Sequence, residues 1–173
     1  MLSYELIDTS WGPFVVVSTG LGLKASLLPG EWDEPIEAVI ARRWPGARKA
    51  RHVPAELRKA VRSYFRGKTI GFNVPLDLSA LTEFRQRVTE AARRIPYGRT
   101  ASYTDLARAA GHPRASRAAG STMACNPLPL FVPCHRVLRS DGSLGGFSAP
   151  DGSDGLAMKR RLLALEGIGE GPA

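Results

Sequence analysis

The hydrophobic periodicity changes once along this 173-residue chain, and that change limits the folds it can adopt. Between residues 4 and 28, short apolar and β-branched runs are separated by Ser10-Trp11-Gly12-Pro13 and by Gly20-Leu21-Gly22, which predicts an antiparallel three-stranded sheet. After residue 33 the apolar residues recur at helical spacing, which predicts helices at about 34–43 and 55–66. The pattern therefore indicates a mixed α/β chain of the α+β type.

The stretch 70–80 is extended and aperiodic, so we expect it to link two domains. The first is a sheet-and-helix domain over 1–75, the second is a mostly helical domain over 79–167, and a tail follows at 168–173. In the second domain, Ser102 and Asp105 have the spacing of a capping box that begins a helix at 102–110. Gly111 ends that helix, and Pro113 is placed in the first turn of the next, at about 113–124. Two short helices joined in this way predict a helix-turn-helix.

The positive charge is concentrated in two parts of the chain. Residues 41–70 carry ten Lys and Arg against one acid, and residues 79–139 carry ten Arg against three acids, within a net charge of +8. Such clustering suggests a polyanionic partner, nucleic acid first, although a solvated basic face explains charge alone equally well. Apolar residues make up 43% of the chain and no run approaches the roughly 20 residues of a membrane span. Because Met1–Thr9 also lacks the features of a secretion signal, we expect no membrane partner and a cytoplasmic protein, or a nuclear one in a eukaryotic host.

The two cysteines, Cys125 and Cys134, do not form a disulfide framework or a C-x-x-C metal pair. In Pro133-Cys134-His135-Arg136 the thiol has a His and an Arg beside it, a setting that favours the thiolate. Taken in isolation, the block favours the alternative that Cys134 is a buried small hydrophobe, as most free cysteines are. We interpret Cys125 as structural and Cys134 as the candidate nucleophile.

The Pro-Cys-His-Arg block is one of several motifs that occur in a fixed order. The others are Ile95-Pro96-Tyr97-Gly98, Ser102-Tyr103, Ser116-Arg117-Ala118, Asn126-Pro127, Gly145-Gly146-Phe147-Ser148 and Leu162-Leu163-Ala164-Leu165-Glu166-Gly167. Together they resemble the O6-alkylguanine-DNA alkyltransferases, also called methylated-DNA–protein-cysteine S-methyltransferases. The resemblance covers about 80–167, while the first 75 residues are compatible only in pattern. It implies a ribonuclease H-like N-terminal domain and a winged helix-turn-helix-like C-terminal domain.

The resemblance also implies a chemistry, namely irreversible, single-turnover transfer of an alkyl group from O6-alkylguanine in DNA, with O4-alkylthymine as a second candidate lesion, to Cys134. His135 would take the thiol proton through a water, Glu166 would orient and charge the imidazole, and Tyr103 would donate a hydrogen bond or proton to the leaving guanine. Read without the resemblance, Glu166 is a solvated helix end and Tyr103 a packing residue. No cofactor or metal is expected, because residues 1–124 lack the cysteines with which some relatives bind zinc.

The implied partner is double-stranded DNA bound through the minor groove by a monomer, with the damaged base flipped out of the helix. Arg117 would fill the space that the base leaves, and further contacts to DNA are assigned to Arg114, Ser102, Ser116 and Arg136. An Arg on a helix can also be a simple phosphate contact. The resemblance assigns structural or pocket roles to Asn126, Pro129, Ser148 and Lys159. Ser148 begins a loop, 148–154, that is longer than the family pattern and that we expect to wall the pocket.

Three other functions are compatible with parts of this pattern. A non-catalytic alkyltransferase-like lesion sensor would lack the acceptor thiol, which is present here as Cys134. A helix-turn-helix transcription factor would not need Pro-Cys-His-Arg. A cysteine hydrolase would turn over, because water regenerates a thioester but not a thioether.

Overall fold

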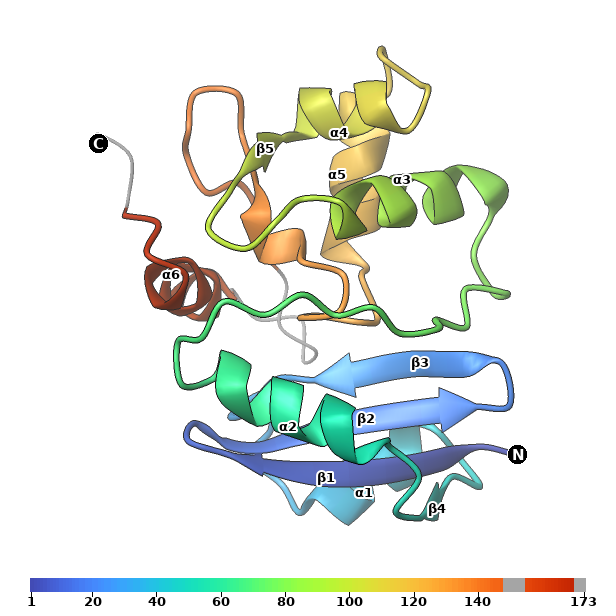
Figure 1. Cartoon of the computed structure of the whole chain (residues 1–173). Helices are drawn as coiled ribbons and strands as arrows, with labels where there is room; N and C mark the ends of the chain where they lie inside the picture. The colour runs from blue at the N-terminus through green and yellow to red at the C-terminus, as the bar shows by residue number, and fades with distance from the viewer. Residues whose placement is uncertain (148–154, 170–173) are drawn as a thin grey trace. The chain divides into compact units, whose positions relative to one another are not determined.

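The computed structural model describes residues 1–147 and 155–169, and it divides into two compact units, Met1–Asp77 and Leu78–Ala173. The division lies inside the aperiodic stretch 70–80. Figure 1 shows the strands of the first unit and the helices of the second along the chain.

The sheet of the first unit contains the three expected antiparallel strands. These are β1 (Ser3–Thr9), β2 (Gly12–Thr19) and β3 (Gly22–Leu27), and a fourth strand, β4 (Arg48–Lys49), lies parallel to β1 in the order β3-β2-β1-β4. The three-stranded prediction is confirmed for β1–β3 but it missed β4. Both residues of β4 are exposed, so this strand has no alternation of apolar and polar residues by which a sequence pattern could reveal it.

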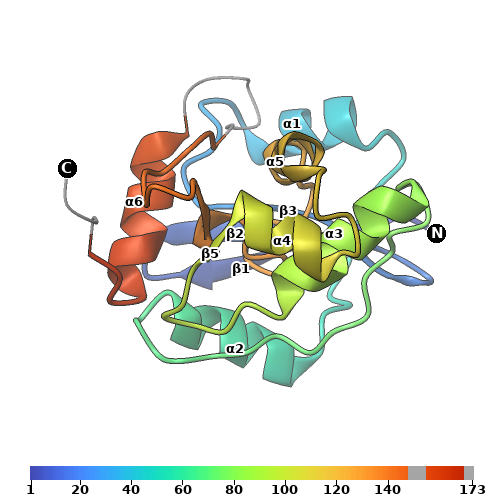
Figure 2. The same ribbon diagram turned by 90° about the horizontal axis from the view of Figure 1, so that it is seen from above.

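Two helices cover the opposite faces of this sheet (Figure 2). Helix α1 (Ile36–Arg43) packs Val39 and Ile40 against one face, formed by Tyr4, Val15, Val17, Ala25 and Leu27. Helix α2 (Ala55–Tyr64) contacts β1 and buries Leu57, Val61 and Tyr64, next to the rings of Phe65 and Phe14. Because successive side chains of a strand point to opposite faces, the sheet contributes apolar side chains to the core under α1 and to the core under α2. Helix α1 begins directly after Pro35, two residues later than predicted, and α2 begins at the predicted residue and ends two residues earlier than predicted.

The last residues of the first unit are held against β3. The amide of Leu23 donates to the Pro75 carbonyl at 2.9 Å and the amide of Asp77 donates to the Leu23 carbonyl at 2.7 Å. Gly22 permits this approach, because a Cβ at its position would lie 2.5 Å from the Pro75 oxygen. The polypeptide is thus anchored immediately before the second unit begins.

The second unit is built on three short helices. Helix α3 (Glu83–Arg93) contacts both α4 (Tyr103–Ala109) and α5 (Ser116–Ala124), which also contact each other as a helix-turn-helix. The predicted capping box is confirmed, because the Ser102 hydroxyl accepts from the Asp105 amide and the Asp105 carboxylate accepts from the Ser102 amide. It fixes the start of α4 and so the position of Tyr103.

The start of α5 differs from the sequence prediction. The helix begins at Ser116 rather than Pro113, because residues 112–115 form a turn in which the Ala115 amide donates to the His112 carbonyl at 2.9 Å. Arg114 therefore lies in the turn, and the prediction that it shares a helix with Arg117 was wrong.

The segment that carries Cys134 lies between the helix-turn-helix and the last helix. It contains a single 3₁₀ turn, η1 (Cys134–Arg136), followed by β6 (Val137–Leu138), which pairs in parallel with β5 (Ala101–Ser102). Helix α6 (Leu156–Leu165) contacts η1 and lies apart from α3–α5 in both ribbon views. Within the described ranges, no helix combines the length and the apolar content that a bilayer span requires.

Candidate active site

Asn126 fixes the Cys134 segment and contacts the sulfur itself. Its amide nitrogen donates to the Val132 carbonyl at 2.9 Å and to Sγ of Cys134 at 3.1 Å, while its carbonyl oxygen accepts from the Leu128 amide at 3.0 Å. Leu130 is buried with a left-handed φ of 78°, and Pro129 forms a bridge to Val132. A donor aimed at sulfur favours the charged thiolate over the thiol. The turn at 126–133 thus presents Cys134 with a hydrogen bond suited to a nucleophile.

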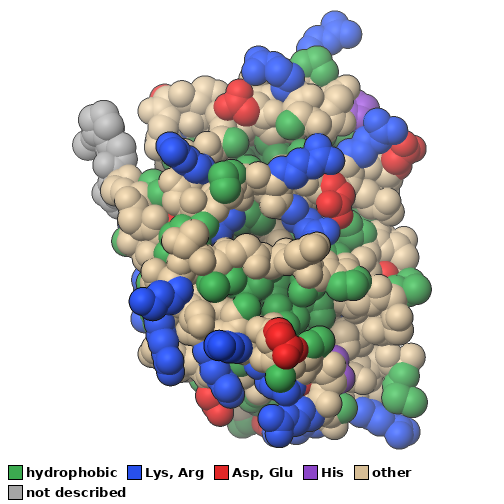
Figure 3. Space-filling view, viewed as in Figure 1, with side chains coloured by type: hydrophobic (Ala, Val, Ile, Leu, Met, Phe, Trp, Pro, Cys, Tyr) green, Lys and Arg blue, Asp and Glu red, His purple; other side chains and the backbone are tan. Residues whose placement is uncertain are grey.

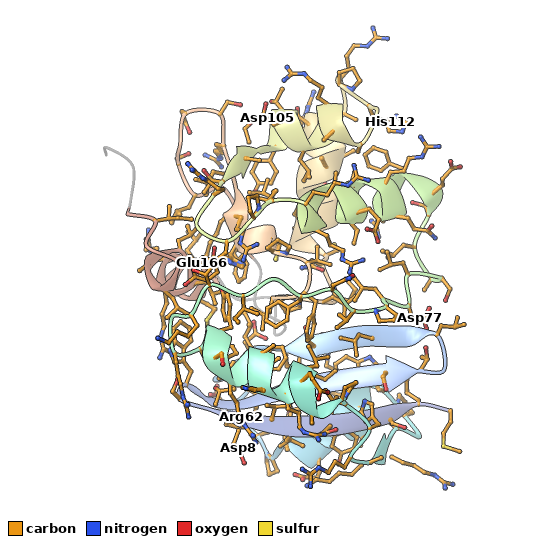
Figure 4. The ribbon with its side chains drawn as sticks, in the orientation of Figure 1. Asp8, Arg62, Asp77, Asp105, His112 and Glu166 are labelled. Atoms are coloured by element: carbon orange, nitrogen blue, oxygen red, sulfur yellow. The ribbon has the colours of Figure 1, made fainter. Side chains whose placement is uncertain are left out.

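A buried cluster of charged groups follows Cys134 directly. Oε1 of Glu166 lies 2.7 Å from Nε2 of His135, and the Arg136 guanidinium donates to both Glu166 oxygens, at 2.8 Å from Nε and 2.9 Å from Nη2. The Glu166 side chain is fully buried at the end of α6, where Figure 4 labels it. The Gly98 amide donates to Glu166 at 3.1 Å, and the Ile95 carbonyl accepts from Arg136 at 2.7 Å. The Ile95–Gly98 motif therefore completes this cluster through its backbone, a role that its residue types did not indicate.

This cluster fixes the protonation of His135. The carboxylate can only accept, so Nε2 carries the hydrogen and Nδ1 has the lone pair. Burial lowers the pKa of His135, and this outweighs the hydrogen bond and charge of Glu166, which raise it. The resting imidazole is therefore neutral and able to take a proton. Glu166 is placed to orient this imidazole, and its charge favours the imidazolium once a proton has been taken up.

Tyr103 approaches the same segment from the first residue of α4. Burial raises the pKa of its phenol, the charge of Cys134 raises it further, and Arg139 lowers it only in part. A Cβ at Gly145, whose φ is 67°, would lie 2.8 Å from the Tyr103 oxygen, so the backbone there can be formed only by glycine. Because its pKa is raised, the Tyr103 hydroxyl keeps its proton near neutral pH and can donate it.

Lys159 is fully buried although two exposed arginines follow it. Its ammonium donates to the carbonyls of Val137 at 2.7 Å and Gly146 at 3.4 Å, and also to that of Leu144. Burial lowers its pKa from 10.5 to about 8, while the charge of Cys134 raises it. Lys159 thus joins the backbone around Tyr103 to the backbone beside Cys134 and places a positive charge near the thiol.

Comparisons with known proteins identify the family of the chain. Residues 83–168, about half of the chain, match the family model of the 6-O-methylguanine DNA methyltransferase, DNA binding domain. The chain is 36% identical over 169 residues to the methylated-DNA–protein-cysteine methyltransferase of Mycobacterium tuberculosis, covering 96% of this chain and 93% of that protein. The chain belongs to the methylated-DNA–protein-cysteine methyltransferase family.

Other members of the family show the same relationship. The constitutive methyltransferase of Bacillus subtilis is 37% identical, over 80% of this chain and 76% of its own length. The bifunctional transcriptional activator and DNA repair enzyme Ada of Escherichia coli is 36% identical, and the chain spans about half of it, 46% of its length. The crystal structure of Mycobacterium tuberculosis OGT in complex with DNA superposes with a TM-score of 0.76 at 34% identity, over 95% of this chain and 93% of that one.

The structure of this methyltransferase family member separates the predicted DNA contacts into three groups. Arg114 and Arg117 are exposed, while Ser102 and Ser116 are half-buried at the starts of α4 and α5. Arg136 is not on the surface. Its guanidinium is buried and bonded to Glu166 and Ile95, which favours a structural role over the predicted contact with DNA. Ser148 and the loop 148–154 lie outside the described residues. In the part of the chain that is described, no group of three or more His, Cys, Asp or Glu side chains could hold a metal ion.

The buried ammonium of Lys159 predicts a pH dependence of stability. The unfolded chain protonates this amine near pH 10.5 and the folded chain near pH 8. Between these values the unfolded state binds more protons, so the contribution of Lys159 to the unfolding free energy increases as the pH rises from about 8 to about 10.5. The full increase is about 3 kcal/mol.

Denaturant unfolding of the wild type and of Lys159→Met across this range measures the effect, since other titrations cancel in the difference. The wild type should gain stability relative to the variant as the pH rises. A difference that stays constant across the window would contradict the buried ammonium.

Proposed function

We propose that this chain repairs alkylated guanine in duplex DNA by accepting the alkyl group on Sγ of Cys134. The observation that carries the proposal is the contact of Sγ with the amide of Asn126 beside the buried His135–Glu166–Arg136 cluster. A structural cysteine needs neither a donor to its sulfur nor a neutral imidazole in the next residue. Membership of the methyltransferase family supports the same reaction.

The reaction balances without a cofactor. His135 takes the thiol proton at Nδ1 through a water, and Nε2 stays bonded to Glu166, which stabilises the imidazolium that forms. The Sγ lone pair forms a bond to the alkyl carbon as the bond from that carbon to guanine O6 breaks. The electron pair of the broken bond stays on the guanine. The carbon–sulfur bond of the product is a thioether, which water does not cleave.

Tyr103 is the group that we assign to the leaving guanine. The departing base carries negative charge unless a proton reaches it, and a donor near that charge lowers the barrier. The raised pKa of Tyr103 keeps the phenol protonated until this step. The tyrosine regains its proton from solvent.

We further infer that the base is flipped from the duplex and that α5 enters the minor groove. The chemistry requires the alkyl carbon to reach the thiol of Cys134, a residue that is only 6% exposed, which a base inside the helix cannot do. Arg117 projects from the first turn of α5 and is exposed, and helix positions 118–120 carry only small residues. A long side chain on a helix of small residues is suited to filling the space that a flipped base leaves.

Mass spectrometry tests the proposed function directly. After incubation with duplex DNA that contains one O6-methylguanine, the intact protein should gain the mass of one methyl group, and the peptide that carries Cys134 should contain it. A protein that binds the lesion without gaining mass would instead be a lesion sensor.

The role of Arg117 predicts a difference between two substrates. Arg117→Ala should slow repair of duplex DNA about 10-fold or more and should largely spare reaction with free O6-benzylguanine, because only the duplex requires a base to be replaced. Arg114→Ala serves as the matched control. It lies in the exposed turn and should weaken binding to all sequences and reduce the salt dependence. Equal losses on duplex and free base would reject the assignment of Arg117.

A further inference from the structure

The first unit has a basic hollow that the proposed chemistry does not use. We call it the β4–α2 hollow, and it is lined by Glu5, Leu6, Lys49, Ala50, Arg51, Arg58 and Arg62. Four of these seven residues are Lys or Arg, contributed by β4, the segment after it and α2. Figure 4 labels Arg62 next to Asp8, and the Nε of Arg62 donates to the Asp8 carbonyl at 3.1 Å, which orients the guanidinium without neutralising it.

The single acid that lines the hollow, Glu5, already has hydrogen-bond partners within the first unit. Glu5 is buried and accepts from the amides of His52 and Val53, both at 2.8 Å, and from Arg58 at 3.1 Å. Its charge therefore offsets Arg58 and leaves the other cations of the hollow in excess. Lys49 has only an exposed contact to Glu37 at 3.6 Å, which is weak in water. Throughout residues 1–147 and 155–169, no carboxylate lies within 4.0 Å of Arg51 or Arg62.

The excess charge continues beyond the hollow on α2 and on the segment that follows it. Lys59, Arg66 and Lys68 are exposed, and Figure 3 shows Lys and Arg side chains gathered over the lower part of the view, where Figure 1 places α2. Like charges placed together repel one another, so the folded state gains nothing from this arrangement by itself. Because Arg58 is paired with Glu5, the cations in excess are Lys49, Arg51 and Arg62, which come from β4, the segment after it and α2. Cations on neighbouring segments suit an extended polyanion better than a single small anion.

We propose that the β4–α2 hollow binds the phosphodiester backbone of duplex DNA, as a second and sequence-independent contact outside the helix-turn-helix unit. The inference rests on the proposed function, which supplies the polyanion. Arginine forks bind phosphate oxygens in pairs, and each neutralised phosphate releases condensed counterions. The contact would therefore increase affinity for all sequences and make binding more dependent on salt, while the helix-turn-helix unit carries the lesion-specific step.

Two matched double variants test the second contact. Arg51→Gln with Arg62→Gln removes two charges from the hollow, and Arg42→Gln with Arg43→Gln removes two exposed charges from α1, on the opposite face of the sheet. Affinity for an undamaged 30-base-pair duplex is measured at several NaCl concentrations. The slope of log K against log [NaCl] should fall by about 1 to 2 in the first variant, because each lost phosphate contact reduces it by about 0.9. The slope should not change in the second variant.

Transfer from free O6-benzylguanine is measured in parallel, because it needs the Cys134 chemistry and no DNA. A wild type that fails this assay and also gains no methyl group from O6-methylguanine in a duplex would contradict the proposed function. If the wild type transfers the benzyl group and the two double variants have equal slopes, the second contact alone is contradicted. An acidic protein would then be the alternative partner of the hollow.

Repeating the salt titration with duplexes of two lengths shows whether the hollow and the helix-turn-helix unit bind the same duplex. A slope difference seen with 30 base pairs and lost with 10 base pairs would mean that the hollow contacts the same duplex as the helix-turn-helix unit. A difference that persists with 10 base pairs, together with two duplexes bound per protein, would mean that it contacts a second duplex. Either result supports phosphodiester binding.

Discussion

Repair by this protein is expected to stop after one alkyl group per polypeptide, and the Cys134→Ser variant is expected to repair none. The thioether formed on Cys134 has no leaving group that water could displace. The only other thiol in the sequence, Cys125, is exposed rather than placed in the buried cluster. Serine retains its proton near neutrality and is a much weaker nucleophile than a thiolate. Product formation should therefore plateau at a 1:1 ratio however long the incubation.

Quantifying repaired guanine against total protein over time measures this stoichiometry. Cys125→Ser is the matched control and should reach the same plateau at the wild-type rate. Cys134→Ser should still bind damaged duplex DNA, since the helix-turn-helix unit is unaltered. More than one turnover per protein, or an alkyl group found on Cys125, would rule out this mechanism.

The sequence predicted the reactive thiol because neighbouring residues carry the signal. Proline, histidine and arginine beside Cys134 indicate a stiff and electropositive segment before any fold is known. The partner Glu166 is 31 positions from His135 and was assigned through the family resemblance alone. No local periodicity relates an acid on a terminal helix to a histidine in a 3₁₀ turn.

The burial of Arg136 could not be predicted from the motif. Adjacent basic residues usually suggest a surface, but η1 turns Cys134, His135 and Arg136 inward, so that all three are buried. A side chain buried in this way must be paired, and Glu166 supplies the pair. Burial depends on packing between η1 and α6, which is tertiary information.

Lys159, in contrast, carried a signal that could have been used. It precedes Leu162 and Leu163 by three and four residues and Glu166 by seven, so all four lie on one face of α6. The two leucines mark that face as buried, which distinguishes Lys159 from the exposed Arg160 and Arg161. Helical phase alone therefore predicts a buried lysine facing the same region as Glu166.

The buried ion pair between Arg136 and Glu166 should account for a large part of the stability of the second unit. Arg136→Met leaves a buried carboxylate without its guanidinium bonds, and Glu166→Gln leaves a buried guanidinium opposite a neutral amide. Removing one partner of a buried pair costs about 3–5 kcal/mol, because the remaining charge is not compensated. Each single variant is therefore expected to lower the unfolding free energy by about that amount, and the double variant to lower it by less than the sum.

The double variant also separates stability from chemistry. Combining Arg136→Met with Glu166→Gln removes both charges and should restore part of the unfolding free energy, but His135 still faces an amide in place of a carboxylate. Transfer from free O6-benzylguanine should then remain roughly 10- to 100-fold slower than in the wild type, because the imidazolium formed on proton transfer is no longer stabilised. The midpoint of the pH dependence of the transfer rate should move to higher pH. Without the carboxylate His135 is a weaker base, so a larger share of the Cys134 thiol has to ionise unassisted. Measured rates that recover together with stability would show that Glu166 acts only through packing, and additive losses would show that the two side chains are not coupled.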